Sequence, residues 1–243
     1  MFSSTTRSVV AVAGLAMATA SLAACAPTSS AHGLTVVATT TQICDYVTQI
    51  AARSADISLD KTDAAGKNSH VGAAPDSAAL TMSLTCLLAP NASAHEHEMT
   101  PAQTSALAQA DVMAVSGVDL EHFLDDAVVS SGFKGRMVVT SGVLTAADVD
   151  NPGAPDPDGA YMIDRGNQRV DVAPWPFPPE EAGEEPEFRF DPHVWTSPKG
   201  ARVQVANLGA GLAAAAPDAA SSINAATASY LEDIDALDQW TAE

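Results

Sequence analysis

The sequence is poor in basic residues. Its 243 residues include only 11 Lys and Arg against 30 Asp and Glu, which gives a formal net charge of −19 at pH 7. Proteins that bind nucleic acid need Lys and Arg to neutralise phosphates. The composition therefore excludes nucleic acid as a partner. An acidic surface instead suits an extracytoplasmic protein that stays soluble and attracts cations.

The apolar run near the N-terminus is too short to span a bilayer. Arg7 precedes this run, which covers residues 9–22, and the combination is typical of a secretory signal peptide over residues 1–24. The segment Leu22-Ala-Ala-Cys25 resembles the bacterial lipobox, in which the cysteine carries the lipid. We expect lipidation at Cys25, a tether over residues 25–33, and anchoring on the extracytoplasmic face of the cell membrane. The alternative is an ordinary signal peptide followed by a buried or free cysteine.

Cysteine is scarce, with three in the whole chain. If Cys25 carries lipid, Cys44 and Cys86 remain as a pair in an oxidising compartment, where such pairs commonly form disulfides. The distance between their Cα atoms decides whether they bond, and the sequence leaves both states open.

Apolar runs alternate with segments of helical spacing after the tether. Strands are predicted at residues 34–38, 80–88, 112–115 and 136–140, with helices at about 43–51, 100–111 and 120–129. Thr100-Pro-Ala-Gln103 has the pattern of a capping box that opens a helix. Strands that alternate with helices predict an α/β fold with a parallel sheet flanked by helices.

Residues 145–190 differ in composition, because they hold more than half of the chain's 15 prolines and many acids. Proline fixes φ and lacks an N–H, so we expect an extended, solvated insertion here. An alternative is a loop that gathers cations through its glutamates, namely Glu180, Glu181, Glu184, Glu185 and Glu187. Beyond it, Pro198 and Pro217 occupy first-turn positions of two helices, the second with an amphipathic stripe that continues to residue 243.

Histidines occur in two short motifs with metal-binding chemistry. His95 and His97 lie in Ala94-His-Glu-His-Glu98, between a strand and a capped helix, where parallel α/β folds place ligands. His193 lies in Asp191-Pro-His-Val-Trp195, where proline stiffens the turn and tryptophan shields the imidazole. Neutral imidazoles suit a divalent metal such as zinc. The other histidines, His32, His70 and His122, are interpreted as surface residues.

These segments occur in an order that resembles the cluster A-I substrate-binding lipoproteins of zinc and manganese ABC transporters. The resemblance covers residues 34–243 except the insertion and is carried by residues 35–40, 87–101, 110–111, 117–121 and 191–195. It implies the first lobe of a two-lobed periplasmic-binding-protein fold with a helical backbone. Residues 34–217 would form this N-terminal metal-binding lobe, and residues 218–243 the start of the inter-lobe helix.

The resemblance also implies a ligand set and a function. His95 and His193 match the two metal histidines of the first lobe, with His97 and Glu98 as possible additions, while the remaining ligands come from a second lobe. The protein would capture Zn²⁺, or less favourably Mn²⁺, for an ABC permease and its ATPase, without enzymatic activity. With only these first-lobe ligands, the site would be incomplete in this chain and its affinity poor.

Two other functions stay open at the level of sequence. One is a surface adhesin or inert lipoprotein on the same scaffold. The other is a zinc hydrolase that uses His95, His97 and His193, with Glu96 or Glu98 as general base. The sequence lacks His-Glu-x-x-His and Gly-x-Ser-x-Gly motifs, which disfavours the hydrolase.

Overall fold

The computed structural model describes Met1 and residues 33–152, 159–179, 184, 186 and 188–243. The chain divides into two compact units, residues 1–30 and 31–243. Residues 2–24 of the predicted signal peptide, the predicted lipidation site Cys25 and His32 lie outside the described residues.

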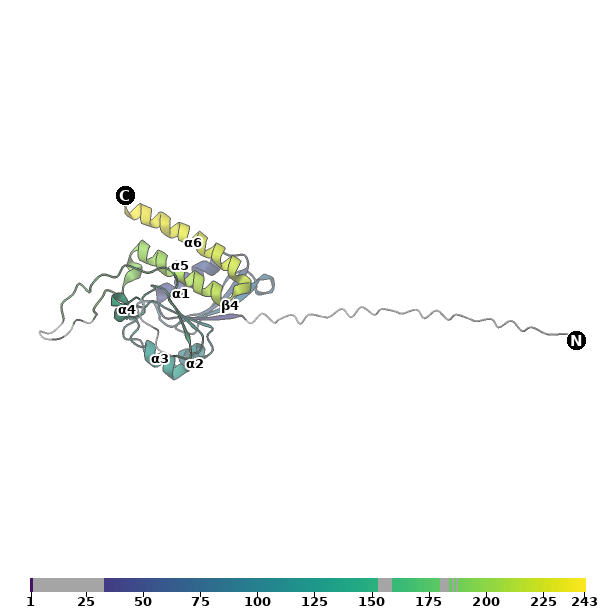
Figure 1. Ribbon diagram of the computed structural model, residues 1–243, viewed down its shortest axis with the longest axis horizontal. Helices are drawn as coiled ribbons and strands as arrows, with labels where there is room; N and C mark the ends of the chain where they lie inside the picture. The colour runs from purple at the N-terminus through teal and green to yellow at the C-terminus, as the bar shows by residue number, and fades with distance from the viewer. Residues whose placement is uncertain (2–32, 153–158, 180–183, 185, 187) are drawn as a thin grey trace. The chain divides into compact units, whose positions relative to one another are not determined.

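A seven-stranded sheet forms the centre of the second unit (Figure 1), in the order β3-β2-β4-β1-β5-β6-β7. Its strands are β1 Leu34–Ala38, β2 Ile57–Thr62, β3 Asn68–Gly72, β4 Leu80–Cys86, β5 Val112–Val115, β6 Arg136–Val139 and β7 Met162–Asp164. All neighbouring strands are parallel except β2 and β3, which are antiparallel. The predicted α/β fold with a parallel sheet is confirmed.

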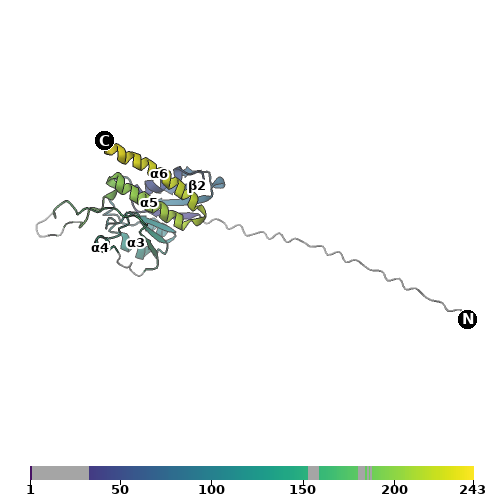
Figure 2. The same cartoon turned by 45° about the horizontal axis from the view of Figure 1, so that its top comes forward.

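Helices cover both faces of the sheet. They are α1 Thr41–Ala52, α2 Pro101–Ala108, α3 Leu124–Ser131, α4 Ala146–Asp150, α5 Pro198–Ala215 and α6 Ala220–Thr241. Apolar side chains of α1, α5 and α6 form one core cluster with the sheet, and those of α2 and α3 contribute to a second. Figures 1 and 2 show these two groups of helices on opposite faces. No helix among the described residues is long and apolar enough to cross a membrane.

Two helix starts follow the sequence signals. The Thr100 hydroxyl accepts a hydrogen bond from the backbone N–H of Gln103, whose side chain accepts one from the N–H of Thr100, so the predicted capping box is present. Ser197 caps α5, with Pro198 at its first position. The helix predicted from residue 120 begins only at Leu124, after a turn in which residues 117–119 have positive φ angles.

The expectation of an extended, solvated insertion over residues 145–190 is wrong for several of its described parts. The segment contributes helix α4 and the edge strand β7, and the side chains of Val170 and Phe188 are buried. Ala173 and Asp191 are hydrogen-bonded through their backbones, as are Trp175 and Arg189. Apolar burial and backbone pairing thus outweigh the proline content. Of the five glutamates proposed to gather cations, only Glu184 is among the described residues.

Asn207 of α5 links the insertion to the sheet. Its side-chain amide donates hydrogen bonds to the carbonyls of Thr140, at 2.9 Å, and Gln168, at 2.8 Å. Its side-chain carbonyl accepts the N–H of Gln168 at 3.1 Å. Asn207 is fully buried, so these bonds fix the path of the chain after β7.

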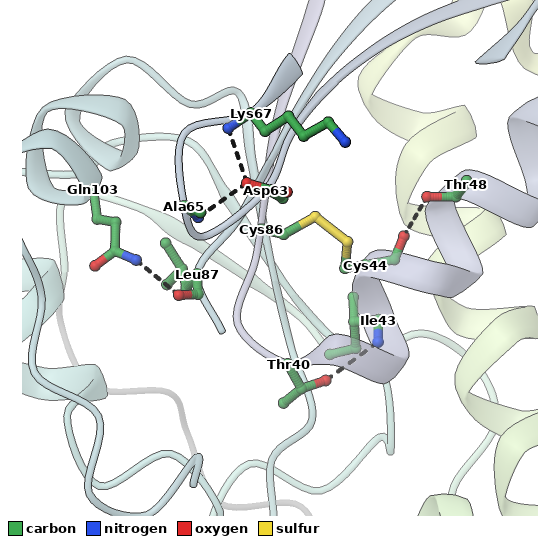
Figure 3. Close-up of a disulfide and its surroundings, with 10 residues drawn as sticks. All are labelled: Thr40, Ile43, Cys44, Thr48, Asp63, Ala65, Lys67, Cys86, Leu87 and Gln103. Atoms are coloured by element: carbon green, nitrogen blue, oxygen red, sulfur yellow. Dashed lines mark hydrogen bonds between the residues drawn. A yellow bond between two sulfur atoms is a disulfide. The ribbon is translucent and has the colours of Figure 1, made fainter. Parts of the chain in front are cut away.

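A disulfide joins Cys44 of α1 to Cys86, the last residue of β4 (Figure 3). The sulfur atoms are 2.01 Å apart and the Cα atoms 5.6 Å apart. Ala38 pairs with Cys86 in register, and α1 begins three residues after Ala38, so Cys44 in the first turn of α1 comes close to Cys86. The bond fixes the end of β4, from which the loop with His95 departs.

Candidate metal site

The loop between β4 and α2 carries His95 and is held at both ends. The N–H of Leu87 donates to the carbonyl of Ala38 at 3.0 Å, and the amide of Gln103 donates to the carbonyl of Leu87 at 2.7 Å (Figure 3). The loop therefore leaves the carboxyl end of β4 in a fixed direction. At this edge of a parallel sheet, β/α folds place their ligands.

His95 reaches across to the segment that follows β5. Its Nδ1 lies 3.2 Å from the carbonyl oxygen of Leu120. A carbonyl only accepts, so Nδ1 must carry the proton in this contact. In the neutral imidazole the lone pair then lies on Nε2, which is the atom suited to bind a metal.

His193 is oriented by the carboxylate of Asp191. One oxygen of Asp191 accepts a hydrogen bond from the backbone N–H of His193 at 3.0 Å and lies 2.8 Å from its Nδ1. A carboxylate that holds Nδ1–H leaves Nε2 as the ligand atom, as is usual for histidines that bind metals. The Asp-Pro-His motif thus has a local physical role, because the aspartate fixes the histidine two residues later.

The fold brings His95 and His193 together from two segments that are far apart in the sequence. Their ring centres are 5.5 Å apart. Two imidazoles bound to one tetrahedral zinc, with Zn–N bonds of about 2.0–2.1 Å, hold their ring centres about 5 Å apart. The observed separation is close to this value, so the pair fits a shared metal ion of the zinc type.

His97 and Glu98, the two further ligands that the sequence suggested, do not join His95 and His193 in a larger group of metal ligands. The ring of His97 packs against Phe123, with ring centres 4.9 Å apart, and its Nε2 is buried without a hydrogen-bond partner among the described residues. Burial lowers the pKa of His97. In the part of the chain that the structure describes, no three His, Cys, Asp or Glu side chains are arranged to hold a metal.

Aromatic side chains surround the two histidines. The ring of Phe188 is centred 4.8 Å from that of His95, and Trp175 and Trp195 lie 5.9 and 5.3 Å from that of His193. The sequence indicated shielding by Trp195 but missed Trp175 and Phe188, because both belong to the insertion. Rings packed in this way limit the access of water to the imidazoles.

His122, which the sequence analysis interpreted as a surface residue, lies near the pair of His95 and His193. It is exposed, as expected, but its ring centre lies only 5.8 Å from that of His95. Its position after β5 was the available signal, because that strand ends at the same edge of the sheet as β4. His70, by contrast, is on β3, exposed, and bonded to Asp60.

The turn before His122 is strained and firmly held. Val118 and Asp119 have φ angles of 59° and 55°, which residues other than glycine rarely adopt. The buried carboxylate of Glu121 accepts hydrogen bonds from the N–H groups of Ser116 and Gly117 and from the hydroxyl of Thr39. Burial raises the pKa of Glu121. Such strain persists only where surrounding bonds impose it, and it is frequent at functional sites.

These features define one class of protein, an α/β binding lobe with paired imidazoles at the carboxyl edge of a parallel sheet. The family described as zinc-uptake complex component A, periplasmic (ZnuA), matches residues 78–243, and the chain belongs to this family.

Solved structures share this fold at low sequence identity. Zn(II)-bound AdcA from Streptococcus pneumoniae matches with a TM-score of 0.52 and 18% identity, over 85% of this chain and 32% of that chain. The metal-dependent lipoprotein YcdH from Bacillus subtilis matches with a TM-score of 0.51 and 17% identity, over 85% and 54%. The chain therefore spans about a third to a half of the length of these proteins.

Proposed function

We propose that this chain captures a divalent metal ion on the extracytoplasmic side of the membrane for an ABC importer, with His95 and His193 as two of the ligands. The observation that carries the proposal is the 5.5 Å separation of their rings at the carboxyl edge of the sheet. Membership of a zinc-uptake family supports it.

Zinc is the metal that the donor atoms favour. Both histidines present Nε2, since Nδ1 of each lies against an oxygen acceptor. Imidazole suits zinc, whereas manganese prefers carboxylate, carbonyl and water oxygens. The metal is cargo: it is bound, carried and released to a permease coupled to an ATPase, and no covalent bond in a substrate is broken.

The hydrolase alternative has no support in the geometry. It requires His97 beside His95 and His193, but the His97 ring packs against Phe123. It would also need three metal ligands in one place, and the described residues hold no group of three His, Cys, Asp or Glu side chains arranged in this way. No observation favours an adhesin.

Metal titration tests the proposal. Residues 31–243, which form one compact unit, are titrated with Zn²⁺ and Mn²⁺ by calorimetry, without an affinity tag that contains histidine. We expect zinc to bind more tightly than manganese and the His95→Ala/His193→Ala double variant to lose zinc binding. The His70→Ala variant is the matched control and should bind as the parent does. A folded double variant with unchanged zinc affinity would refute the proposed site.

Membrane anchoring through Cys25 is tested separately in cells that express the full chain. Labelled fatty acid should be incorporated into the parent and not into Cys25→Ser, which should also leave the membrane fraction. Equal labelling of both would contradict lipidation at this residue.

A further inference from the structure

We propose that Glu121 is a positioning residue of the metal site. It holds the peptide bond between Leu120 and itself so that the Leu120 carbonyl accepts the Nδ1 proton of His95, which leaves the lone pair of His95 on Nε2. The inference rests on the proposed function, in which His95 is a metal ligand. It adds a residue that acts on the metal only through His95.

The carboxylate of Glu121 closes a short turn after β5. Its Oε1 accepts the N–H of Ser116 at 2.6 Å, and its Oε2 accepts the N–H of Gly117 at 3.0 Å. Oε1 also lies 2.6 Å from the hydroxyl of Thr39, which follows β1. Glu121 is only 5% exposed, so water cannot take over these bonds when they are lost. The side chain of Glu121 therefore ties the turn to itself and to the neighbouring strand.

The backbone of this turn needs such support. Val118 and Asp119 have positive φ angles, a strained conformation that persists only where the surroundings impose it. The N–H of Leu120 donates to the carbonyl of Gly117 at 3.2 Å, and the side chain of Leu120 is fully buried. The carbonyl of Leu120 therefore points in a fixed direction.

This carbonyl sets the tautomer of His95. Its oxygen lies 3.2 Å from Nδ1, and a carbonyl only accepts, so the proton lies on Nδ1. A neutral histidine in water instead favours the proton on Nε2, which is the atom that must bind the metal. The bond to Leu120 keeps the lone pair on Nε2 before the metal arrives.

The two histidines of the pair reach the same tautomer in different ways. Nδ1 of His193 lies 2.8 Å from a carboxylate oxygen of Asp191, two residues earlier. Two residues before His95 stands Ser93, whose hydroxyl accepts the backbone N–H of His95 and not its ring. The Leu120 carbonyl takes the place of the missing carboxylate. A neutral acceptor makes the weaker bond, so its orientation matters more.

NMR spectroscopy of the metal-free protein tests the first step. Two-bond ¹⁵N–¹H spectra of residues 31–243 at about pH 8, where imidazoles are neutral, show which nitrogen of each histidine carries the proton. The signals of His95 are identified by their loss in His95→Ala. We expect its proton on Nδ1 in the parent. A proton on Nε2 of His95 in the parent would overturn the inference without any variant.

Glu121→Gln tests the role of the carboxylate. In either orientation its amide NH₂ faces the N–H of Ser116 or of Gly117, so a hydrogen bond is replaced by a contact between two donors. We expect the proton of His95 to move to Nε2 and the zinc affinity, measured by calorimetry, to fall by at least about tenfold. Thr39→Val removes one bond to the carboxylate and should shift both in the same direction by less.

Asp111→Asn is the matched control. Asp111 also accepts a backbone N–H and a hydroxyl, both from Thr35, at 2.8 and 2.7 Å, but at the amino ends of β1 and β5. This variant should keep the tautomer of His95 and the zinc affinity of the parent. A lower stability by itself does not change the tautomer in the folded molecules, so the spectra distinguish positioning from a merely structural role.

The outcomes separate this inference from the proposed function. A folded Glu121→Gln variant with the proton of His95 still on Nδ1, or with unchanged zinc affinity, would overturn the role of Glu121 and leave the pair of histidines intact. Unchanged zinc binding in His95→Ala/His193→Ala would refute the proposed function itself.

Discussion

Removal of the disulfide should cost this lobe a large part of its stability. The perturbation is the double variant Cys44→Ala/Cys86→Ala, which deletes the bond between α1 and the end of β4 and adds no polar group. Both cysteines are buried, at 6% and 3% exposure, so alanine is compatible with their surroundings.

The magnitude follows from the length of the loop that the bond closes. The two cysteines are 42 residues apart in sequence. In the chain-entropy model, a bond that closes a loop of this length lowers the entropy of the unfolded chain and stabilises the folded state by about 4 kcal/mol. For a chain of this size, the melting temperature should fall by roughly 8–16 °C.

Metal binding should respond much less than stability. The loop that carries His95 keeps its anchors without the disulfide, because Leu87 still bonds to Ala38 and Gln103. These local bonds remain intact in the variant. We therefore expect the folded variant to bind zinc with an affinity within roughly a few-fold of the parent's.

Guanidinium unfolding followed by circular dichroism measures the effect. The parent, the double variant and the parent under a reducing agent are compared, and the last two should agree. A fall in the free energy of unfolding of less than about 1 kcal/mol, with the denaturant slope unchanged, would refute the reasoning from loop closure.

Four further substitutions, of which Gly132→Ala is a control, test the packing of the lobe. Asn207→Ala should lower the free energy of unfolding by about 2–4 kcal/mol in urea, since it leaves buried backbone groups without partners. Gly117→Ala should lower the free energy of unfolding by more than about 2 kcal/mol, because φ is 87° and a Cβ would lie 2.1 Å from the carbonyl oxygen of Val143. Gly132→Ala should lower it less, because the space around Gly132 is open. Burial lowers the pKa of His97, so the folded state resists its protonation and stability should fall as the pH drops below about 6.5. In His97→Leu this part of the decline should disappear when urea midpoints are compared between pH 5 and 8.

Local sequence patterns were sufficient to predict the central strands and several of the helices. Strands β1, β4, β5 and β6 are short apolar runs buried on the sheet, and α2 begins at a capping box. Strand β3, with the sequence Asn-Ser-His-Val-Gly, was missed, because it is mostly exposed and forms only by pairing with β2. The three-residue strand β7 depends in the same way on its pairing with β6. Such pairing is not encoded in the apolar pattern of the strand itself.

The sequence by itself determined the residue types and the local motifs of the candidate site. The turn Asp191-Pro-His193 specifies its own geometry, because the carboxylate and the imidazole that it orients are two residues apart. His95 is identified by its place between an apolar strand and a capped helix. These features depend on contacts within a few residues, which a sequence shows directly.

Only the tertiary structure decided which residues meet. The strand order places β1 between β4 and β5, so the loops that follow β4 and β5 lie at the same edge and His122 comes to His95. The hydrogen bonds of the insertion bring Phe188 against the same histidines. Strand order and loop docking arise from burial summed over the whole core, so no short segment contains them.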